Sequence, residues 1–388
     1  MAATIRRLRI ISLGFFVLIA SAVQAATWVV NADGSGDVAT IQNALDIAAS
    51  GDVIQLGAGV FDDYLPDPHW PGSQVYLWVT TDDLTIAGAG RDLSIIGRQD
   101  NEHHEPSVDV VLVEAGLSLE IRDLTLQLDD STDSLLMKLN SSSLVAANCA
   151  FRGAENGVFV YGGSGILIDG CEFEGIEDHA LNLSLDGHGT VENCRFSDVG
   201  LGILVWGDDV RVADSEFVGD PSDPCSVGAN VGEMSSAAFR RCTFRNHGAA
   251  GLHLEASTVD LNDCHIGHGG AYGLNIFNAL LRGRGNVITG TSAAILVHRA
   301  FETHEFERNH IIAGGGWAVE TGWFYGQGGQ LDLAHNWWGT DDPQQIADAI
   351  YDLNDDPDLL LEVVFAPFLD EPTANEARSL SDIKALFR

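Results

Sequence analysis

The sequence is poor in positive charge. It contains 20 Lys and Arg residues against 56 Asp and Glu, which gives a formal net charge of −36. Such a surface repels phosphate backbones and anionic lipid head groups, so we expect no nucleic-acid partner. The same charge opposes the binding of a polyanionic sugar unless cations bridge the sugar and the protein.

Long apolar runs are also scarce. One is present at residues 10–20, after Arg6, Arg7 and Arg9 and before the small residues around Ala25. This order is typical of a secretory signal peptide, and the run is too short to span a membrane. We therefore expect removal of residues 1–25, which leaves 17 Lys and Arg and a net charge of −39. The mature protein is predicted to be a periplasmic, cell-surface or extracellular monomer without membrane insertion.

What the chain has in abundance is a repeat. A Cys, Ser or Asn residue recurs at steps of 21 to 27 residues, and in most repeats Phe or Ile follows two positions later. The recurring positions are Cys149, Cys171, Cys194, Ser215, Cys242, Cys264, Asn286, Asn309 and Asn336. A fixed period in this range indicates a solenoid, in which each coil packs against its neighbours.

Each coil has room for three short strands. An apolar triplet such as residues 166–168 precedes the recurring position, and a third strand such as residues 158–160 follows about ten residues after it. Between the first and second strands, Asn, Asp or Gly usually occupies a position that suits a left-handed turn, although Arg241, Arg308 and His335 do not fit this pattern. Three parallel sheets are predicted, with alternate side chains inside. The two 27-residue steps predict insertions around residues 221–225 and 322–329.

Six cysteines in an exported chain would normally suggest three disulfides. Five of them occupy the recurring position, and Cys225 lies in a loop. Residues on neighbouring coils are about 4.8 Å apart, which a disulfide tolerates, but parallel Cβ vectors do not favour the bond. We expect a buried ladder of cysteines that act as small apolar side chains, with disulfides allowed but not required.

The ends of the array need covers. Helical spacing of Ile41, Ala44, Leu45 and Ala48 after Thr40 predicts a short capping helix that stops by Gly51. At the other end, we expect a helix opened by Pro343 that includes Ile350, and a closing strand at residues 361–365. The β-solenoid domain is predicted to span residues 26–370, followed by a polar tail at residues 371–388. Residues 62–73, with three prolines, are predicted to be a loop.

The chain resembles the right-handed parallel β-helix proteins of the pectin-lyase-like superfamily. Residues 30–42 look like the N-terminal cap region of pectin methylesterases, and residues 335–340 resemble the Asn-Trp-Gly motif that closes many bacterial β-helix proteins. The resemblance covers roughly residues 27–369. It implies an all-β, right-handed parallel β-helix of three sheets, with a short N-terminal capping helix and a C-terminal cap of a helix and a strand.

The resemblance also implies where chemistry would occur, namely on the outer face of the third-strand sheet. Polygalacturonase-like hydrolases need paired carboxylates before this strand. The matching positions hold no carboxylate: Asn156, His179, Leu201, Val227, Ala250, Tyr272, Ala293 and Trp317. We find neither the Asp and Arg set of pectin methylesterases nor the Ca²⁺ carboxylates and base of pectate lyases. Lys138 is a single cation on this face. The resemblance allows Ca²⁺ as a cofactor, but no set of residues in the sequence identifies a cofactor.

The outer face of the third strands is predicted to carry polar and aromatic side chains. Amides, imidazoles, carboxylates and rings of this kind are typical of sugar-binding grooves. The predicted face consists of Lys138, Phe159, Asn182, Leu204, Asn230, His253, Asn275, Leu296 and Glu320, and next to them Tyr161, Ser184, Trp206, Glu255, Phe277 and His298. We expect Asn182, Trp206, Asn230, Asn275 and Glu320 to bind a glycan. If the protein has catalytic residues, the candidates are His253, Glu255 and His298.

Two other groups were considered as sites. Residues 102–105, with Asp100 and Asp109, resemble metal ligands, but adjacent histidines on an extended loop point apart, so no metal site is predicted. The aromatic residues near the C-terminal end are expected to pack the last coil. Three functions remain open: a carbohydrate-binding or cell-surface protein without a recognised catalytic set, which is our first choice, a polysaccharide lyase, epimerase or hydrolase, and a periplasmic accessory protein.

Overall fold

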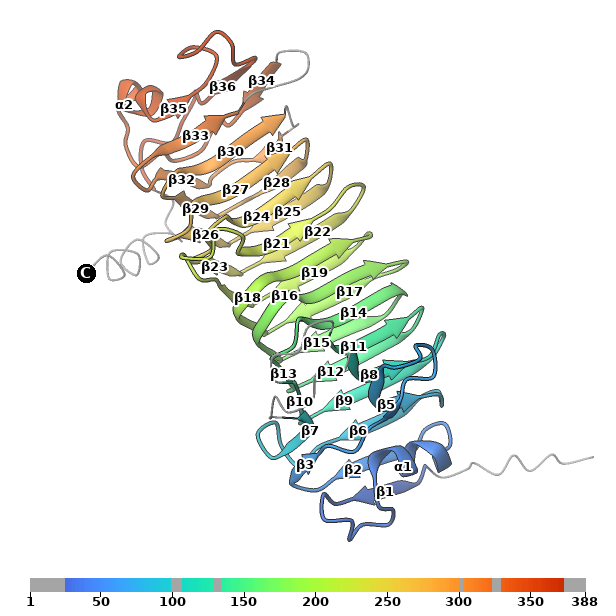
Figure 1. The fold of residues 1–388 in the computed structure, drawn as a ribbon. Helices are drawn as coiled ribbons and strands as arrows, with labels where there is room; N and C mark the ends of the chain where they lie inside the picture. Colours follow the sequence, from blue (N-terminus) through green and yellow to red (C-terminus); the bar gives the residue numbers. More distant parts are fainter. Residues whose placement is uncertain (1–24, 99–106, 129–133, 300–302, 323–328, 373–388) are drawn as a thin grey trace, which may run out of the picture.

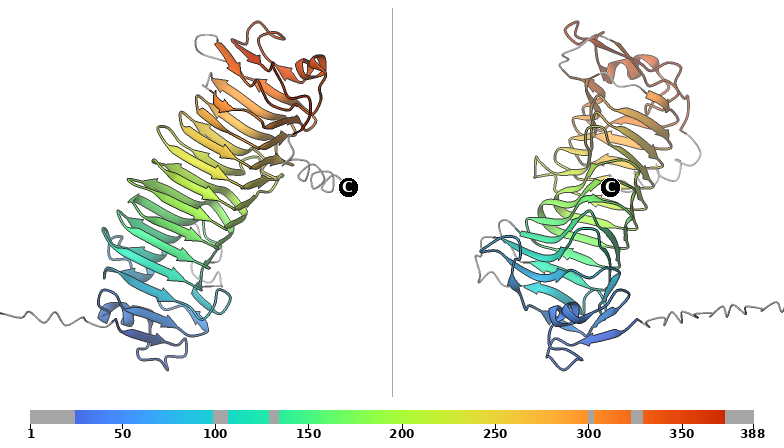
Figure 2. Two further views of the ribbon diagram at one scale, coloured as in Figure 1. Left: turned by 180° about the vertical axis from the view of Figure 1, so that it is seen from behind. Right: turned by 90° about the vertical axis from the view of Figure 1, so that its right-hand side faces the viewer.

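The computed structural model describes residues 25–98, 107–128, 134–299, 303–322 and 329–372. In this part the chain winds from one end of an elongated solenoid to the other (Figure 1). Views from behind and from the side show the coils stacked in sequence order (Figure 2). The prediction of an all-β solenoid of stacked parallel sheets is confirmed. Residues 1–24 of the predicted signal peptide (1–25) and residues 373–388 of the predicted tail (371–388) lie outside the described residues.

The first strands of the coils form one 12-stranded parallel sheet. Its members are β1 (Thr27–Val30), β2 (Val53–Leu56), β6 (Leu84–Ala87), β9 (Ser118–Arg122), β12 (Ser143–Ala147), β15 (Ile166–Asp169), β17 (Gly189–Glu192), β19 (Val210–Ala213), β22 (Ser236–Arg240), β25 (Thr258–Asn262), β28 (Leu280–Arg284) and β31 (Thr303–Phe306).

The second and third strands form two further parallel rows. The second row is β3 (Gly59–Phe61), β7 (Ser94–Arg98), β10 (Thr125–Leu128), β13 (Ala150–Arg152), β20 (Glu216–Val218), β23 (Thr243–Arg245), β26 (His265–His268), β29 (Val287–Gly290) and β32 (His310–Ala313). The third row is β5 (Gln74–Val79), β8 (Val108–Val113), β11 (Ser134–Asn140), β14 (Asn156–Gly163), β21 (Val227–Val231), β24 (Ala250–Glu255), β27 (Tyr272–Phe277), β30 (Ala293–Arg299), β33 (Trp317–Thr321) and β35 (Ile350–Tyr351).

Two long strands, β16 (Glu172–Leu185) and β18 (Arg195–Trp206), run through both rows and join them into one 22-stranded sheet. The predicted three-sheet layout is therefore present, with its second and third faces continuous at these two coils.

The predicted left-handed turns lie between the first and second strands. Asn148, Asn193 and Asp263 have φ values of 51°, 54° and 57°. Arg241, Arg308 and His335 also adopt positive φ, at 52°, 61° and 59°, although they do not fit the Asn, Asp or Gly pattern of the other turns. At Arg241, a hydrogen bond of 2.6 Å from Nε to the Asp214 carboxylate of the preceding coil helps to hold the turn.

A ladder of rings fills the interior. Phe151, Phe173, Phe196, Phe217 and Phe244 are fully buried and stack with centroid distances of 4.5 to 4.7 Å. All six cysteines are free; the five in the recurring position are buried, and Cys225 is exposed. This arrangement agrees with the prediction that the cysteines act as small interior side chains.

In the last coils the same position holds a ladder of buried amides. Asn286 Nδ2 donates to Asn309 Oδ1 at 2.8 Å, and the Asn309 backbone N–H donates to Asn336 Oδ1 at 2.8 Å. Each Nδ2 also donates to a backbone carbonyl, for example Asn309 to Gly283 at 3.2 Å. These bonds satisfy the amides inside the core, where an unpaired polar group would be costly.

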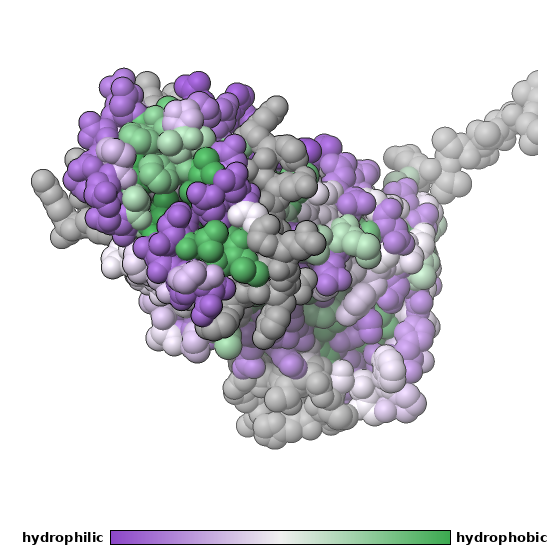
Figure 3. Space-filling view, turned by 90° about the horizontal axis from the view of Figure 1, so that it is seen from above, coloured by the Kyte–Doolittle hydropathy of each residue, from purple (hydrophilic) through white to green (hydrophobic). Residues whose placement is uncertain are grey.

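Both ends are capped. Helix α1 (Ile41–Ile47) covers the first coils, and the Thr40 hydroxyl accepts the Asn43 N–H at 3.1 Å. At the other end, α2 (Pro343–Asp348) lies in the chain between the two members of a two-stranded sheet, β34 (Gly329–Asp332) and β36 (Leu361–Val364). The inclusion of Ile350 in this helix was wrong, because Ile350 begins β35 and pairs with Val319 of β33. Viewed from above, hydrophilic residues surround smaller hydrophobic patches (Figure 3).

Residues 62–73 are more ordered than predicted. They contain β4 (Leu65–Pro66), which pairs antiparallel with the start of β5. The buried Asp67 carboxylate holds the following turn, because it accepts the backbone N–H groups of His69 and Trp70 at 2.7 and 3.0 Å. This β4–β5 hairpin places Trp70 beside the third-strand sheet. Asp109, which lines the groove described below, comes from that sheet.

Candidate functional site

The residues predicted to face outward on the third strands form one continuous register row. In chain order, neighbouring coils pair the row members Trp78, Leu112, Lys138, Phe159, Asn182, Leu204, Asn230, His253, Asn275, Leu296, Glu320 and Tyr351. Most lie between inward-facing apolar residues, as the two-residue alternation of a strand requires, whereas Glu320 and Tyr351 are followed by the buried polar residues Thr321 and Asp352. The predicted face thus exists as a physical row, and its ends extend beyond the residues named from sequence.

The row is not uniformly open. Leu204 is 9% exposed and Leu296 is 7% exposed, so they interrupt the polar surface. Asn230 and Asn275 each have a buried Oδ1 with no hydrogen-bond partner among the described residues. Trp206 is exposed and lies over Gly232, where an added Cβ would be 2.9 Å from the ring.

A groove of about 450 Å³ lies on this face, near its N-terminal end. Residues of the β4–β5 hairpin form one side, and β8, β11 and β14 supply the floor. It is lined by Trp70, Pro71, Ser73, Ser107, Asp109, Ser134, Leu135, Lys138, Glu155, Asn156, Phe159 and Tyr161. The groove therefore combines a carboxyl group, a cation, a phenol and exposed rings.

Sequence reasoning weighed Asp109 only as a metal ligand beside residues 102–105 and missed its position on the third-strand face. Asp109 pairs with Leu135, which pairs with Asn156, so it occupies the row in which no carboxylate was found. That comparison began at Asn156, two coils too late. A usable signal was the apolar run of residues 110–113, which places Asp109 at the start of a third strand.

Asp109 has unusual electrostatics. Asp109 is only 8% exposed, and this burial raises the pKa of its carboxyl group to about 6. The charge of Lys138 opposes the rise, and the charge of Asp67 adds to it. Burial, and then the nearby Asp109 charge, also raises the pKa of the Tyr161 phenol. A carboxyl group of this kind exchanges protons near neutral pH.

The groove also contains groups ready to contact a ligand. Trp70 is 62% exposed, which is unusual for so large an apolar side chain. Phe159 and Tyr161 meet edge to face with centroids 5.9 Å apart. Asn156 Oδ1 is buried without a partner among the described residues. Rings for stacking and unpaired polar atoms thus share one cleft.

The predicted catalytic candidates lie on later coils. His253, Phe277 and His298 form a column of rings, with centroids 5.3 Å apart for the first pair and 4.0 Å for the second. Burial lowers the pKa of both histidines, and the charge of His253 lowers that of His298 further. These rings are therefore neutral at pH 7, which suits stacking and hydrogen bonding.

Other predicted residues are dispersed around this column. Glu255 pairs with Phe277 across neighbouring strands, and its charge favours protonation of His253. Glu320 lies two coils beyond Asn275 in the outward row, and burial raises its pKa. The structure thus brings His253 and His298 together through Phe277, while Asn182 and Trp206 lie several coils away. No carboxylate joins the ring column as a direct hydrogen-bond partner within the described part of the chain.

The other groups considered in the sequence are the acidic and histidine residues at 100–105 and the aromatic residues near the C-terminal end. Residues 100 and 102–105 lie outside the described residues, as do Trp323, Phe324 and Tyr325. Among described residues, no three His, Cys, Asp or Glu side chains gather closely enough to hold a metal ion. Trp317 stacks on Tyr351 at 5.2 Å, and buried Trp338 meets Phe365 at 6.3 Å, so these rings pack the last coils. The described residues include no helix with the length and apolarity of a membrane span.

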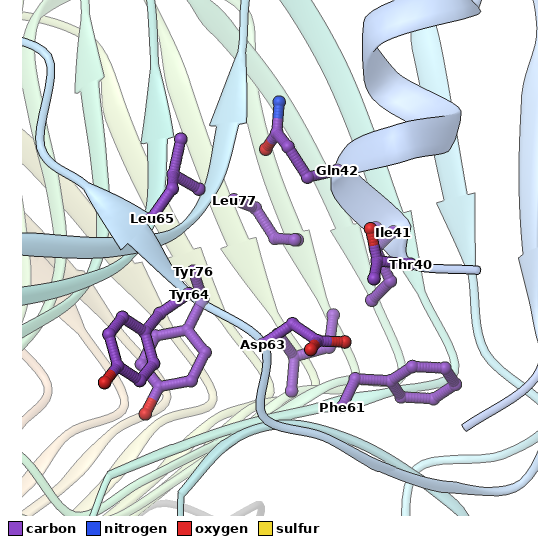
Figure 4. Close-up of a pocket in the computed structure, with 10 residues that line it drawn as sticks. Thr40, Ile41, Gln42, Phe61, Asp63, Tyr64, Leu65, Tyr76 and Leu77 are labelled. Atoms are coloured by element: carbon purple, nitrogen blue, oxygen red, sulfur yellow. The ribbon is translucent and has the colours of Figure 1, made fainter. Parts of the chain in front are cut away.

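A smaller pocket of about 210 Å³ lies between α1 and the β4–β5 hairpin (Figure 4). Phe61, Tyr64 and Tyr76 line it together with Asp63 and Thr40. Gln42 fastens the helix to β5, because its amide exchanges hydrogen bonds of 2.9 and 3.2 Å with the Trp78 backbone. The pocket lies where the cap meets the first coils, which indicates a packing gap of the cap.

A known family model matches part of this chain. The family model for the right-handed beta helix region matches residues 134–311. The chain has a right-handed parallel β-helix fold. The three parallel rows and the stacked interior ladder are the features of this β-helix that the sequence repeat encodes. A search of curated proteins finds no match.

Solved β-helix structures are similar at low identity. The A-module of a mannuronan C-5 epimerase from Azotobacter vinelandii is 16% identical with a TM-score of 0.49, over 86% of this chain and 94% of that one. An alginate lyase from Paenibacillus sp. is 12% identical with a TM-score of 0.40, over 81% and 95%. The catalytic unit of an α-1,3-glucanase from Streptomyces thermodiastaticus is 11% identical with a TM-score of 0.45, over 86% and 65%.

Proposed function

We propose that this is an exported protein that binds a polysaccharide along the outer face of its third-strand sheet. The observation that carries the proposal is the 450 Å³ groove in which Trp70, Phe159 and Tyr161 surround Lys138 and Asp109. Rings stack on the apolar faces of sugars, and the polar groups between them bind hydroxyls. The outward row continues this surface along the stack, so a chain of several sugars has contacts beyond the groove.

Binding to a glycan panel by calorimetry tests this proposal. Trp70→Ala removes the most exposed ring of the groove, so we expect affinity for a bound oligosaccharide to fall about tenfold or more. Leu93→Ala is the matched control, because Leu93 is similarly exposed on a turn away from the groove. Equal affinities of wild type and Trp70→Ala, or equal losses in both variants, would contradict the proposal.

A second candidate function is supported by Asp109. A carboxyl group with a pKa of about 6 is a suitable general acid or base near neutral pH. Lys138 supplies a positive charge in the same groove and Tyr161 supplies a phenol, while Glu155 adds a second carboxyl group. This set fits a lyase, epimerase or hydrolase that moves a proton on a bound sugar.

Incubation with acidic and neutral polysaccharides distinguishes binding from catalysis. Unsaturated-uronate absorbance reports a lyase, and new reducing ends report a hydrolase. If Asp109 transfers the proton, Asp109→Asn abolishes turnover but leaves binding, because the amide keeps the shape and cannot ionise. Turnover that survives this substitution would leave binding as the function of the groove.

A further inference from the structure

The outer face of the first sheet carries a small, regular array of polar side chains. It lies on three adjacent strands, β22, β25 and β28, whose residues alternate between interior and surface. The outward positions, strand by strand, are Ser236, Ala238 and Arg240, then Thr258, Asp260 and Asn262, then Leu280, Arg282 and Arg284. We call these nine positions the arginine face.

The arginine face has a charge opposite to that of the protein. Arg240, Arg282 and Arg284 are exposed, and none has an ion pair with another described residue. Asp260 is the one carboxylate among the nine positions, so the face carries a net charge of about +2. Arg211 of β19 lies opposite Ala238, but it pairs with Asp209 at 2.8 Å. In a chain with a net charge of −36, this face is a local region of positive charge.

A groove of about 530 Å³ lies at the beginning of the same three strands. Its lining includes Ser236, Thr258 and Leu280, the first outward residues of the arginine face. Asp208 is the one carboxylate in this lining, and it accepts the Ser236 hydroxyl at 3.1 Å. Arg282 and Arg284 follow Leu280 at two-residue steps, about 7 Å each along β28. Groove and arginines therefore form one continuous surface that runs along the strands.

A buried hydroxyl beside this groove has no hydrogen-bond partner among the described residues. Ser257 lines it and is 5% exposed, yet its Oγ has no partner among the described residues. The serines before the first strand of other coils are satisfied. Ser142 accepts the Leu117 N–H at 3.2 Å, and Ser235 accepts the Gly207 N–H at 3.0 Å. Ser257 thus retains hydrogen-bonding capacity that its counterparts use within the protein.

We propose that this groove and the arginine face form a second binding site, for an anionic oligosaccharide. Sugar hydroxyls occupy the groove and bond to Ser257 and Thr258, and negatively charged groups bond to Arg240, Arg282 and Arg284. Arg240 and Arg284 are two coils apart, about 10 Å, so a chain with a charge on successive or alternate sugars reaches both. Guanidinium groups bind carboxylate and sulfate in a bidentate manner, so both are suitable anions.

The site is independent of the function proposed for the third-strand face, because it lies on another sheet and shares no residue with the Asp109 groove. Three probes separate the anions: hexagalacturonate carries carboxylates, a heparin hexasaccharide carries sulfates, and maltohexaose is neutral. Calorimetry with the full chain should show binding of at least one anionic probe, weakened by added NaCl, and no binding of maltohexaose at this site.

The double variant Arg282→Gln/Arg284→Gln should lower affinity for the anionic probe about tenfold or more, because it removes two charge-assisted contacts. Arg122→Gln is the control, since Arg122 is an exposed arginine on the same sheet at β9. Ser257→Ala should weaken binding by a smaller factor, and Trp70→Ala should leave it unchanged. No binding of either anionic probe, an equal loss in Arg122→Gln, or a loss in Trp70→Ala alone would overturn the proposal.

Discussion

The interior ladder and the outward row of the third strands come from the same coils, but only the ladder repeats. Phe151 to Phe244 stack as nearly parallel rings, with interplanar angles of 4° to 12°. In the outward row, Lys138 is followed by Phe159 and then Asn182, with no common chemistry. The ladder must fit its neighbours above and below, whereas the row faces solvent and is free to differ. Repetition in this molecule marks stability, and its absence marks where binding can reside.

The largest effect is expected inside the ladder. Phe196 is fully buried and stacks on Phe173 and Phe217, each at 4.6 Å. Phe196→Ala should destabilise the coils by about 3–5 kcal/mol through lost burial and a cavity. Phe159→Ala, on the outward row, should cost far less. Guanidinium denaturation monitored by circular dichroism compares the two, and equal losses would remove the distinction between ladder and row.

The second-largest loss of stability is expected in the amide part of the ladder. Asn309 accepts two hydrogen bonds from Asn286 and donates one to the Gly283 carbonyl. Asn309→Ala leaves these buried groups unpaired, at a cost of about 3 kcal/mol. Cys194→Ala at the equivalent position should cost about 1 kcal/mol, because a thiol packs mainly as a small apolar group. The same denaturation measurement ranks them, and a larger loss for Cys194→Ala would contradict this account.

Replacement of Asp109 should increase the stability of the protein at neutral pH, whereas the replacements in the ladder lower it. The folded-state Asp109 pKa of about 6 lies above its ordinary value of 3.8, so its contribution is most favourable below pH 4 and is lost as the pH rises through about 6. The loss is at most about 3 kcal/mol. Asp109→Asn should therefore flatten the fall in stability between pH 4 and pH 6 and stabilise the protein at pH 7.

Denaturation midpoints across this pH range check the Asp109 prediction. Asp62→Asn is the control, since Asp62 is an exposed carboxylate directly after β3. A pH profile unchanged by Asp109→Asn would mean that the groove does not desolvate this carboxyl group, and its role as an acid or base would lose its basis.

The ladder could be predicted from the sequence because each coil states the same pattern. Spacing and residue type together placed Asn148 at a left-handed turn, whereas Arg241 and His335 share its place in the repeat but not its residue type; all three adopt positive φ. The outward row followed from counting about ten residues beyond each recurring position. Local periodicity carries this information, since the two-residue alternation of a strand fixes which side chains face outward.

The properties of the groove could not be predicted in this way. Asp109 lies before the first clear repeat, and its burial depends on a hairpin that folds over β8 from residues 62–73. The arginine face is divided over three strands, so Arg240 and Arg284 are 44 positions apart in the sequence but only two coils apart in space. Burial and charge clustering arise from stacking, which single-coil patterns do not record.

The smallest change in stability is expected at the ring column of the outward face. His253→Ala/Glu255→Ala removes two half-buried side chains that do not bond to the core, so the free energy of unfolding should change by less than about 1 kcal/mol. Glycan binding, in contrast, should weaken if the saccharide extends from the Asp109 groove along the row. If the double substitution leaves glycan-array binding unchanged, the saccharide binds only to the N-terminal part of the face, where Lys138 and Trp70 lie.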